Sequence, residues 1–228
     1  MKYIKKYLNK IKNPKILDVG AGTGKYSIEL YNMGYNVTAI ELVKHNLRLI
    51  QKKCPNIKSY EGNAINLKKF KDNSFDMILL FGPIYHLISK EEKIKALMEA
   101  KRLVKENGFI LVSYCMNDYA LITYAFKENN IKKCIDNELI DNDYHIKSKP
   151  DDLYSYVRLQ DIDELNKLSN LKRIEIVSQD GPTDYIRPFI NKLSDDEFNY
   201  FIKYQESICD RPELLGASSH VLDIIKKS

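Results

Sequence analysis

The chain has 228 residues, of which 44% are hydrophobic and 29% charged, and a formal net charge of +5. This length suits one α/β domain with a sizeable core, and no apolar run approaches the roughly 20 residues that cross a bilayer. The N-terminus lacks the apolar core and cleavage site of a secretory signal, so we expect a cytoplasmic protein. The cysteines and histidines are scattered without the spacing of a zinc site or a disulfide framework, so no metal is expected.

Positive charge is concentrated at the N-terminus, where residues 1–15 carry six lysines. Such a cluster is either a solvated helix face or part of a nucleic-acid patch. A protein that reads RNA usually shows a larger basic field interleaved with exposed aromatic residues. We therefore expect a solvated face, and nucleic acid is not an expected partner.

Strands and helices alternate through the first half of the chain. The helix expected at 89–107 begins with a capping box, Ser89 and Glu92, and Gly108 is expected just past its end. The alternation predicts an α/β fold with a mostly parallel sheet and helices on both faces. Expected strands cover 15–20, 35–42, 56–63, 74–82 and 109–116, and the other expected helices cover 1–12, 24–34 and 43–54.

Residues 117–160 break this rhythm, because they are rich in Asn, Asp, Lys and Tyr and contain only two weakly helical stretches. We interpret them as an insertion over the strand ends, a lid or substrate element within a single domain of residues 1–228. The alternation then resumes. It predicts a helix at 161–168, a strand at 171–179, a helix at 194–209 and a final strand at 218–225.

The segment ILDVGAGTG (16–24) is the strongest functional signal, because it joins a strand to a helix through three glycines. Open α/β sheets bind nucleosides at this place, and glycines let the backbone approach the ligand. Glu41 ends the second strand, where a carboxylate accepts hydrogen bonds from ribose hydroxyls. Asn63 follows the third strand, where its amide either hydrogen-bonds an adenine or serves only as a turn residue.

With the strand FDMILLFG, these motifs resemble the class I S-adenosylmethionine-dependent methyltransferases. The segment FGPIYHL, the stretch EEKIKALMEAKRLVKENGFILVSY and the tail QESICDRPELLGASSHVL resemble a small-molecule methyltransferase branch marked by L-G-P-L-Y-H-L. The resemblance implies a Rossmann-like sheet of seven strands in the order 3-2-1-4-5-7-6, with strand seven antiparallel. This chain departs from the pattern at Asn63 and Glu41, where Asp is usual or common, and in its short arm before the first strand.

The resemblance also implies S-adenosylmethionine as cofactor and S-adenosylhomocysteine as product. Asp18 and the glycines would surround the methionine part, Glu41 the ribose and Asn63 the adenine. The cofactor-binding residues that the resemblance implies are Asp18, Gly20, Ala21, Gly22, Gly24, Glu41, Leu42, Asn63, Ala64, Phe81 and Gly82.

The acceptor is expected beyond the fourth strand, where Gly82 should leave room for the methyl group. A hydroxyl acceptor needs a base, whereas an amine or thiolate needs none. Histidine is the usual general base at neutral pH, so His86 is the candidate catalytic base, with Tyr85 orienting the substrate. The alternative is that His86 only packs against the loop that follows it. Of the neighbours Tyr114 and Cys115, we expect Tyr114 to face the site, and we assign His220 no catalytic role.

The expected function is methyl transfer to an oxygen, nitrogen or sulfur atom of a small molecule. The alternatives are an RNA or protein methyltransferase, a nicotinamide oxidoreductase and a non-catalytic nucleoside-binding protein. The segment 82–85 lacks the polar residue that precedes proline in enzymes that methylate base amino groups, and G-x-G-x-G differs from the dinucleotide fingerprint. The sequence leaves open the acceptor and whether the protein is a monomer or a dimer.

Overall fold

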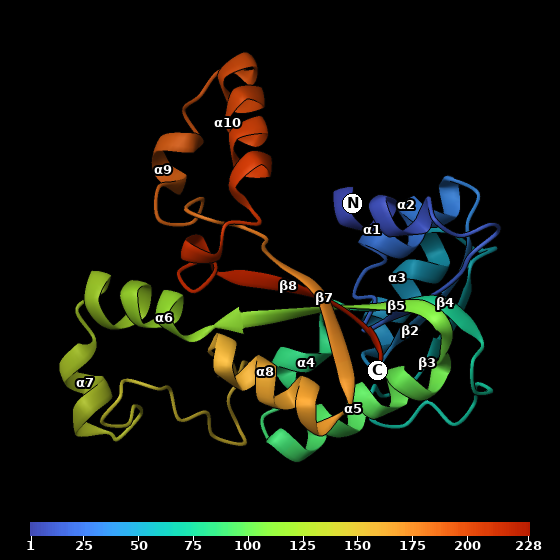
Figure 1. The fold of residues 1–228 in the computed structure, drawn as a ribbon. Helices are drawn as coiled ribbons and strands as arrows, with labels where there is room; N and C mark the ends of the chain where they lie inside the picture. The colour runs from blue at the N-terminus through green and yellow to red at the C-terminus, as the bar shows by residue number, and fades with distance from the viewer.

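The computed structural model describes residues 1–228 as a central sheet with helices on both faces and two projecting arms (Figure 1). Eight strands form one sheet in the order β3-β2-β1-β4-β5-β8-β7, and β6 pairs with β5 outside this path. Strand β8 is antiparallel to both of its neighbours. Without β6 this is the predicted order 3-2-1-4-5-7-6, which is confirmed. The strands are β1 (Lys15–Val19), β2 (Asn36–Glu41), β3 (Lys58–Glu61), β4 (Phe75–Leu80), β5 (Val104–Met116), β6 (Tyr156–Val157), β7 (Leu171–Ser178) and β8 (His220–Lys227).

Helices cover both faces of the sheet, and none has the length and apolar character needed to cross a membrane. A π-helical segment, Leu121–Lys127, continues α6, and a 3₁₀ turn covers Pro212–Leu214. The α-helices are α1 (Lys2–Leu8), α2 (Lys25–Asn32), α3 (Lys44–Lys53), α4 (Pro83–His86), α5 (Lys90–Leu103), α6 (Asn117–Ala120), α7 (Ile131–Asp136), α8 (Leu159–Leu168), α9 (Arg187–Ile190) and α10 (Asp195–Ile208).

The alternation of side chains along the central strands divides the core into two layers. In β4, Met77 and Leu79 pack with α1, α2 and α3, whereas Ile78 and Leu80 pack with α5 and α8. Successive strand residues point to opposite faces of a sheet, so a continuous apolar run is buried on both sides. These core strands end at one common edge, where the loops after β1, β2 and β4 meet.

The helix expected at 1–12 ends earlier, at Leu8, and the expected boundary between α5 and β5 is wrong. Helix α5 ends at Leu103 rather than at residue 107, because Val104 already pairs with Phe75 at the start of β5. Gly108 therefore lies inside β5, where a Cβ atom would come within 2.7 Å of the Asp76 carbonyl oxygen. The two-residue strand β6 was not foreseen, because its pairing depends on the end of β5.

The insertion forms the arm that extends beyond the end of β5 (Figure 1). It has a small core of its own, made by Leu121, Ala125, Cys134 and Ile140. The chain returns to the sheet at β6, where Tyr156 pairs with Cys115. The position of this arm beside the strand ends is consistent with the expected lid, and that role stays a prediction.

A buried carboxylate ties β7, β8 and α8 together. Asp223 on β8 is fully buried, and its oxygens lie 2.6 Å from Arg173 Nε and 2.6 Å from Asn166 Nδ2. Arg173 also pairs with Asp163, which is mostly exposed. Burial raises the pKa of Asp223, and the hydrogen bond and charge of Arg173 oppose that shift. The two carboxylates therefore share one guanidinium in different surroundings.

We predict that Asp223→Ala lowers the free energy of unfolding by about 3 kcal/mol, because it leaves the partly buried Arg173 without its main partner. The matched control Asp163→Ala should cost less than about 1 kcal/mol, as expected for an exposed pair. Urea denaturation of both variants measures the difference. Equal losses would contradict the assignment of Asp223 as the structural anchor.

Candidate functional site

The glycine loop after β1 has a backbone that only glycine adopts readily. Gly20, Gly22 and Gly24 have φ values of +70°, +58° and +85°. The N–H groups of Gly20 and Ala21 both donate to the Ile40 carbonyl, at 2.8 and 3.0 Å, which fixes the loop against β2. A Cβ on Gly22 would meet nothing within 4 Å, so the loop leaves open space there.

Two buried carboxylates flank this loop. Glu41 is only 5% exposed, and its oxygens accept the N–H groups of Gly22 at 2.7 Å and Val43 at 2.8 Å. Each oxygen keeps acceptor capacity for one further donor, which suits the two hydroxyls of a ribose. Burial raises the pKa of Asp18 to about 6; the Ser27 hydroxyl opposes the shift and the Glu41 charge adds to it. The two acids favour a cationic ligand.

An apolar surface lies next to the Glu41 carboxylate. Leu42 and Val43 are 56% and 52% exposed, although both are hydrophobic. Asn63 Oδ1 accepts the Ile65 N–H at 3.1 Å, which leaves its amide NH₂ group without a partner. Ala64 is only 6% exposed, so it presents little surface to a ligand. A ribose acceptor, an exposed apolar surface and a free amide together fit the adenosine part of S-adenosylmethionine.

The glycine loop packs directly on the turn after β4. A Cβ on Gly20 would lie 2.6 Å from Pro83 Cγ, and one on Gly82 would lie 3.1 Å from the Gly20 carbonyl oxygen. We had expected Gly82 to leave room for a methyl group. Instead, the space beside it is filled by the glycine loop, and the absence of a side chain lets α4 begin against that loop. The Phe81 ring meets Tyr26 edge-on at 4.9 Å and closes this side of the site.

His86 connects α4 to the insertion. Its Nδ1 lies 2.8 Å from the Leu153 carbonyl oxygen, so Nδ1 carries a proton and donates it. Beside it, the Ser155 N–H donates to the Tyr85 carbonyl at 2.7 Å, and Ser155 Oγ donates to the Leu87 carbonyl at 2.9 Å. These contacts support the structural alternative for His86, although Nε2 remains available as an acceptor.

Tyr85 lies at the centre of an aromatic and polar cluster. Its ring centroid is 5.8 Å from that of Tyr154 and 5.9 Å from that of His220. Burial raises the pKa of Tyr85 to about 12, so the phenol keeps its proton at neutral pH and acts as a hydrogen-bond donor. Tyr85 thus links the glycine-loop side of the site to a second set of groups.

His220 and Asp180 form the pair that sequence reasoning missed. His220 Nδ1 lies 2.7 Å from Asp180 Oδ2, which also accepts the His220 backbone N–H at 2.9 Å. Hydrogen bonds to Asp180 and then Cys115 raise the pKa of His220 to about 10. Ser218 Oγ holds the two segments together, because it accepts the Gly181 N–H at 3.0 Å and donates to the His220 carbonyl at 2.7 Å.

The only sequence signal for this pair is that Asp180 follows β7 and His220 begins β8. The antiparallel pairing of Ser178 with Val221 brings the two together. Our expectation for the end of β5 was also wrong. Tyr114 is 1% exposed and lies in the core, whereas Cys115 pairs in register with His220 and faces the cluster.

Comparison with known proteins agrees with this geometry. Residues 17–112 match the family described as a methyltransferase domain. The chain is 35% identical over 100 residues to a demethylmenaquinone methyltransferase of Renibacterium salmoninarum. This aligned region covers 43% of this chain and 40% of that protein. It is 26% identical over 204 residues to a ubiquinone biosynthesis O-methyltransferase of Rickettsia typhi. This aligned region covers 87% of this chain and 76% of that protein. The chain spans less than half the length of the first curated relatives it matches.

The fold has counterparts among solved structures. A S-adenosylmethionine-dependent methyltransferase from Methanosarcina mazei superposes with a TM-score of 0.67 and 16% identity, over 100% of this chain and 97% of that one. The shared fold, the family match over the first five sheet strands in chain order and the glycine loop with Glu41 agree with one another. Residues 17–112 match the methyltransferase domain family, and the whole chain has the fold of solved S-adenosylmethionine-dependent methyltransferases.

Proposed function

We propose that the protein transfers a methyl group from S-adenosylmethionine to a small-molecule acceptor. The observation that carries this proposal is the Glu41 carboxylate, which is buried between the glycine loop and the exposed Leu42, with acceptor capacity left on both oxygens. A nicotinamide cofactor also has ribose hydroxyls, but its pyrophosphate would meet the charges of Asp18 and Glu41. A sulfonium cation is instead favoured by them.

S-adenosylmethionine, when bound, supplies a methyl group on a positively charged sulfur. The protein's residues bind and orient the cofactor and the acceptor, and they exclude water from the site. Most of the rate gain in such a transfer arises from these effects. In this proposal Asp18, Glu41 and Asn63 hold the cofactor. Tyr26 and Phe81 shield the site, and Tyr85 directs its phenol O–H towards the acceptor side.

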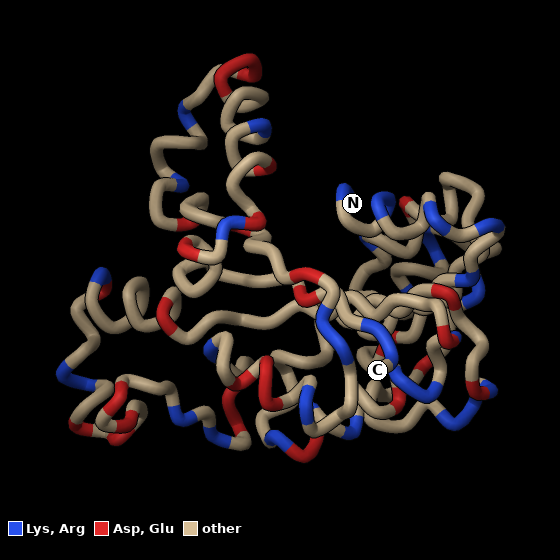
Figure 2. The backbone as a smooth tube through the Cα atoms, in the orientation of Figure 1, with Lys and Arg blue, Asp and Glu red and all other residues tan.

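The distribution of charge supports a small acceptor over a nucleic acid. Lysines and arginines are interspersed with acidic residues along the chain, and the tip of α10 is acidic (Figure 2). Asp18, Glu41 and Asp180 lie at the proposed site. A phosphate backbone would need a basic surface there.

Glu41→Ala should weaken the binding of S-adenosylhomocysteine about 100-fold, because it removes hydrogen bonds from the ribose hydroxyls to a charged group. The matched control is Glu61→Ala, since Glu61 pairs in register with Glu41 at the end of β3 but is half exposed. It should change the affinity less than about twofold. Isothermal titration calorimetry measures both, and thermal melting without ligand checks that the variants fold. Unchanged affinity in Glu41→Ala would refute the ribose assignment.

The proposed transfer itself is tested with methyl-labelled S-adenosylmethionine and a cell extract separated into small-molecule, RNA and protein fractions. We expect label in the small-molecule fraction only. Label confined to RNA or protein would favour the macromolecular alternative. Thermal stabilisation by NAD and not by S-adenosylhomocysteine would overturn the cofactor assignment, because only a bound ligand stabilises the fold. Binding without label transfer would indicate a non-catalytic nucleoside-binding protein.

A further inference from the structure

The acceptor side of the site is built on three adjacent strands. Tyr156 on β6 pairs in register with Cys115 on β5, and Cys115 pairs in register with His220 on β8. Residues in register on neighbouring strands point to the same face, and each strand spacing is about 4.8 Å. Tyr156 and His220 are therefore about 10 Å apart along one row, a distance that an aromatic ring with a substituent can span.

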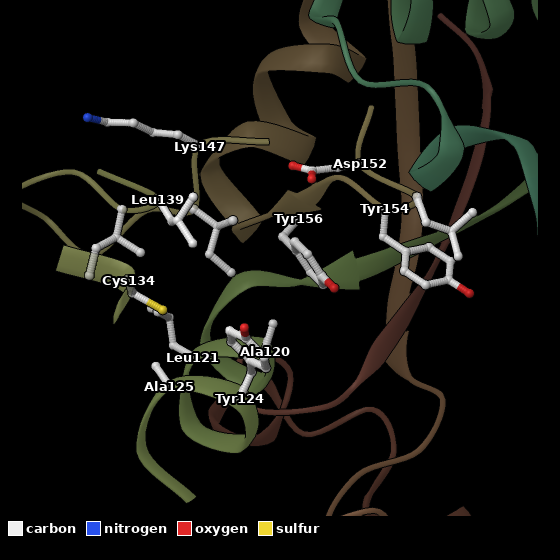
Figure 3. A pocket seen from close by; sticks show the side chains of 13 residues that line it. Ala120, Leu121, Tyr124, Ala125, Cys134, Leu139, Lys147, Asp152, Tyr154 and Tyr156 are labelled. Carbon is white, nitrogen blue, oxygen red and sulfur yellow. The ribbon is translucent and has the colours of Figure 1, made fainter. Parts of the chain in front are cut away.

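An apolar cavity opens at the Tyr156 end of this row. It has a volume of about 360 Å³ and lies inside the insertion, where 11 of its 13 lining residues are hydrophobic. Figure 3 shows Tyr156 between the apolar side chains Leu121, Leu139 and Cys134 and the ring of Tyr154. Lys147 and Asp152 are its only charged lining residues, and the Lys147 ammonium points away from the cavity in this view. The cavity suits an uncharged, apolar group.

A hydrogen-bond donor lies at the other end of the row. His220 Nδ1 is taken by Asp180 and Ser219, so its Nε2 is left with only the Cys115 sulfur, a weak acceptor that an ionised oxygen would displace. The remaining group that faces the ring is Tyr85. Because the Asp180 pairing raises the pKa of His220, the imidazole stays doubly protonated at neutral pH.

Deepening the proposed function, on which it rests, we propose that the methyl acceptor is an acidic hydroxyl compound, a phenol, that carries an apolar group. The apolar group occupies the insertion cavity, and the ionised oxygen accepts a hydrogen bond from His220. The ring of Tyr85, which lies between those of Tyr154 and His220, packs against the aromatic ring of the acceptor. An amine acceptor would not suit this donor, because its lone pair must stay free for attack.

The proposed methyl transfer to a phenol needs no strong base in the protein. The phenol loses its proton to water as it binds, and the hydrogen bond from His220 stabilises the phenolate. A lone pair of the phenolate oxygen forms the new bond to the methyl carbon while the bond from that carbon to sulfur breaks. The electron pair of the broken bond returns to sulfur, which gives a methyl ether and S-adenosylhomocysteine. His220 keeps its proton throughout, and we therefore call it a substrate-binding residue.

The test uses 4-hexyl-2-nitrophenol, whose phenolate absorbs visible light, with S-adenosylhomocysteine present. Binding to the protein should shift the ionisation equilibrium of the probe at least tenfold towards the phenolate, since hydrogen bonds to charged groups are strong. The parent 2-nitrophenol, which lacks the apolar tail, should bind at least tenfold more weakly. A spectrophotometric pH titration measures both quantities without any need for turnover.

Three variants locate the effect. His220→Gln should bind the hexyl probe but lose the shift. Asp180→Asn should keep the shift near pH 6 and lose it above about pH 8, because His220 would return towards its ordinary pKa. Ala120→Phe, which narrows the cavity, should weaken binding of the hexyl probe but not of 2-nitrophenol. Thermal melting confirms that each variant is folded.

Each contrary result has a definite meaning. A full shift in His220→Gln would overturn the role of His220, and equal affinity for the two probes would overturn that of the cavity. Normal binding of S-adenosylhomocysteine with no bound probe would refute this inference and leave the proposed function standing. Failure to bind S-adenosylhomocysteine would refute the proposed function itself.

Discussion

The close contact between the glycine loop and the first turn of α4 is the constraint on which the site depends. Strands β1 and β4 are parallel neighbours, so the turns after them emerge at the same edge of the sheet. These turns can touch only because Gly20 and Gly82 lack side chains: a Cβ on Gly20 would overlap Pro83. The contact brings Tyr85, two residues beyond Pro83 in α4, to the boundary between the proposed cofactor half and the proposed acceptor half of the site.

The two proposed halves differ in their electrostatics, and the difference suits the proposed methyl transfer. The cofactor half contains two buried acids, Asp18 and Glu41, which favour a cation. On the acceptor side the His220–Asp180 pair is neutral as a whole, but it presents a fixed N–H donor beside aromatic rings. In the proposed reaction, a positive methyl donor and an ionised acceptor oxygen would therefore have separate, complementary surroundings.

The arrangement of the proposed cofactor half could be predicted from the sequence, because each of its motifs lies within a single strand end or the loop that follows it. The glycines and Glu41 lie at the ends of consecutive strands, and a strand followed by a helix places them at one edge. The acceptor half could not be read in this way. His220 and Asp180 meet only through the antiparallel pairing of β7 with β8, and nothing in either segment alone reveals that register.

Two smaller errors have similar physical causes. Sequence alternation shows that only one of Tyr114 and Cys115 faces the site, but not which one, because a shift of one residue reverses the faces of a strand. The end of α5 was misplaced because pairing of Val104 with Phe75 in the sheet outweighs the helical tendency of residues 104–107. At both the end of β5 and the end of α5, contacts with other strands determine a structure that the local sequence does not specify.

A crystal structure of the protein with S-adenosylhomocysteine tests the central claim most directly. The account predicts that both ribose hydroxyls donate to Glu41 and that the adenine lies against Leu42. The sulfur should face the space beside Tyr85. A nucleoside bound elsewhere, or one whose ribose hydroxyls make no contact with Glu41, would contradict the account.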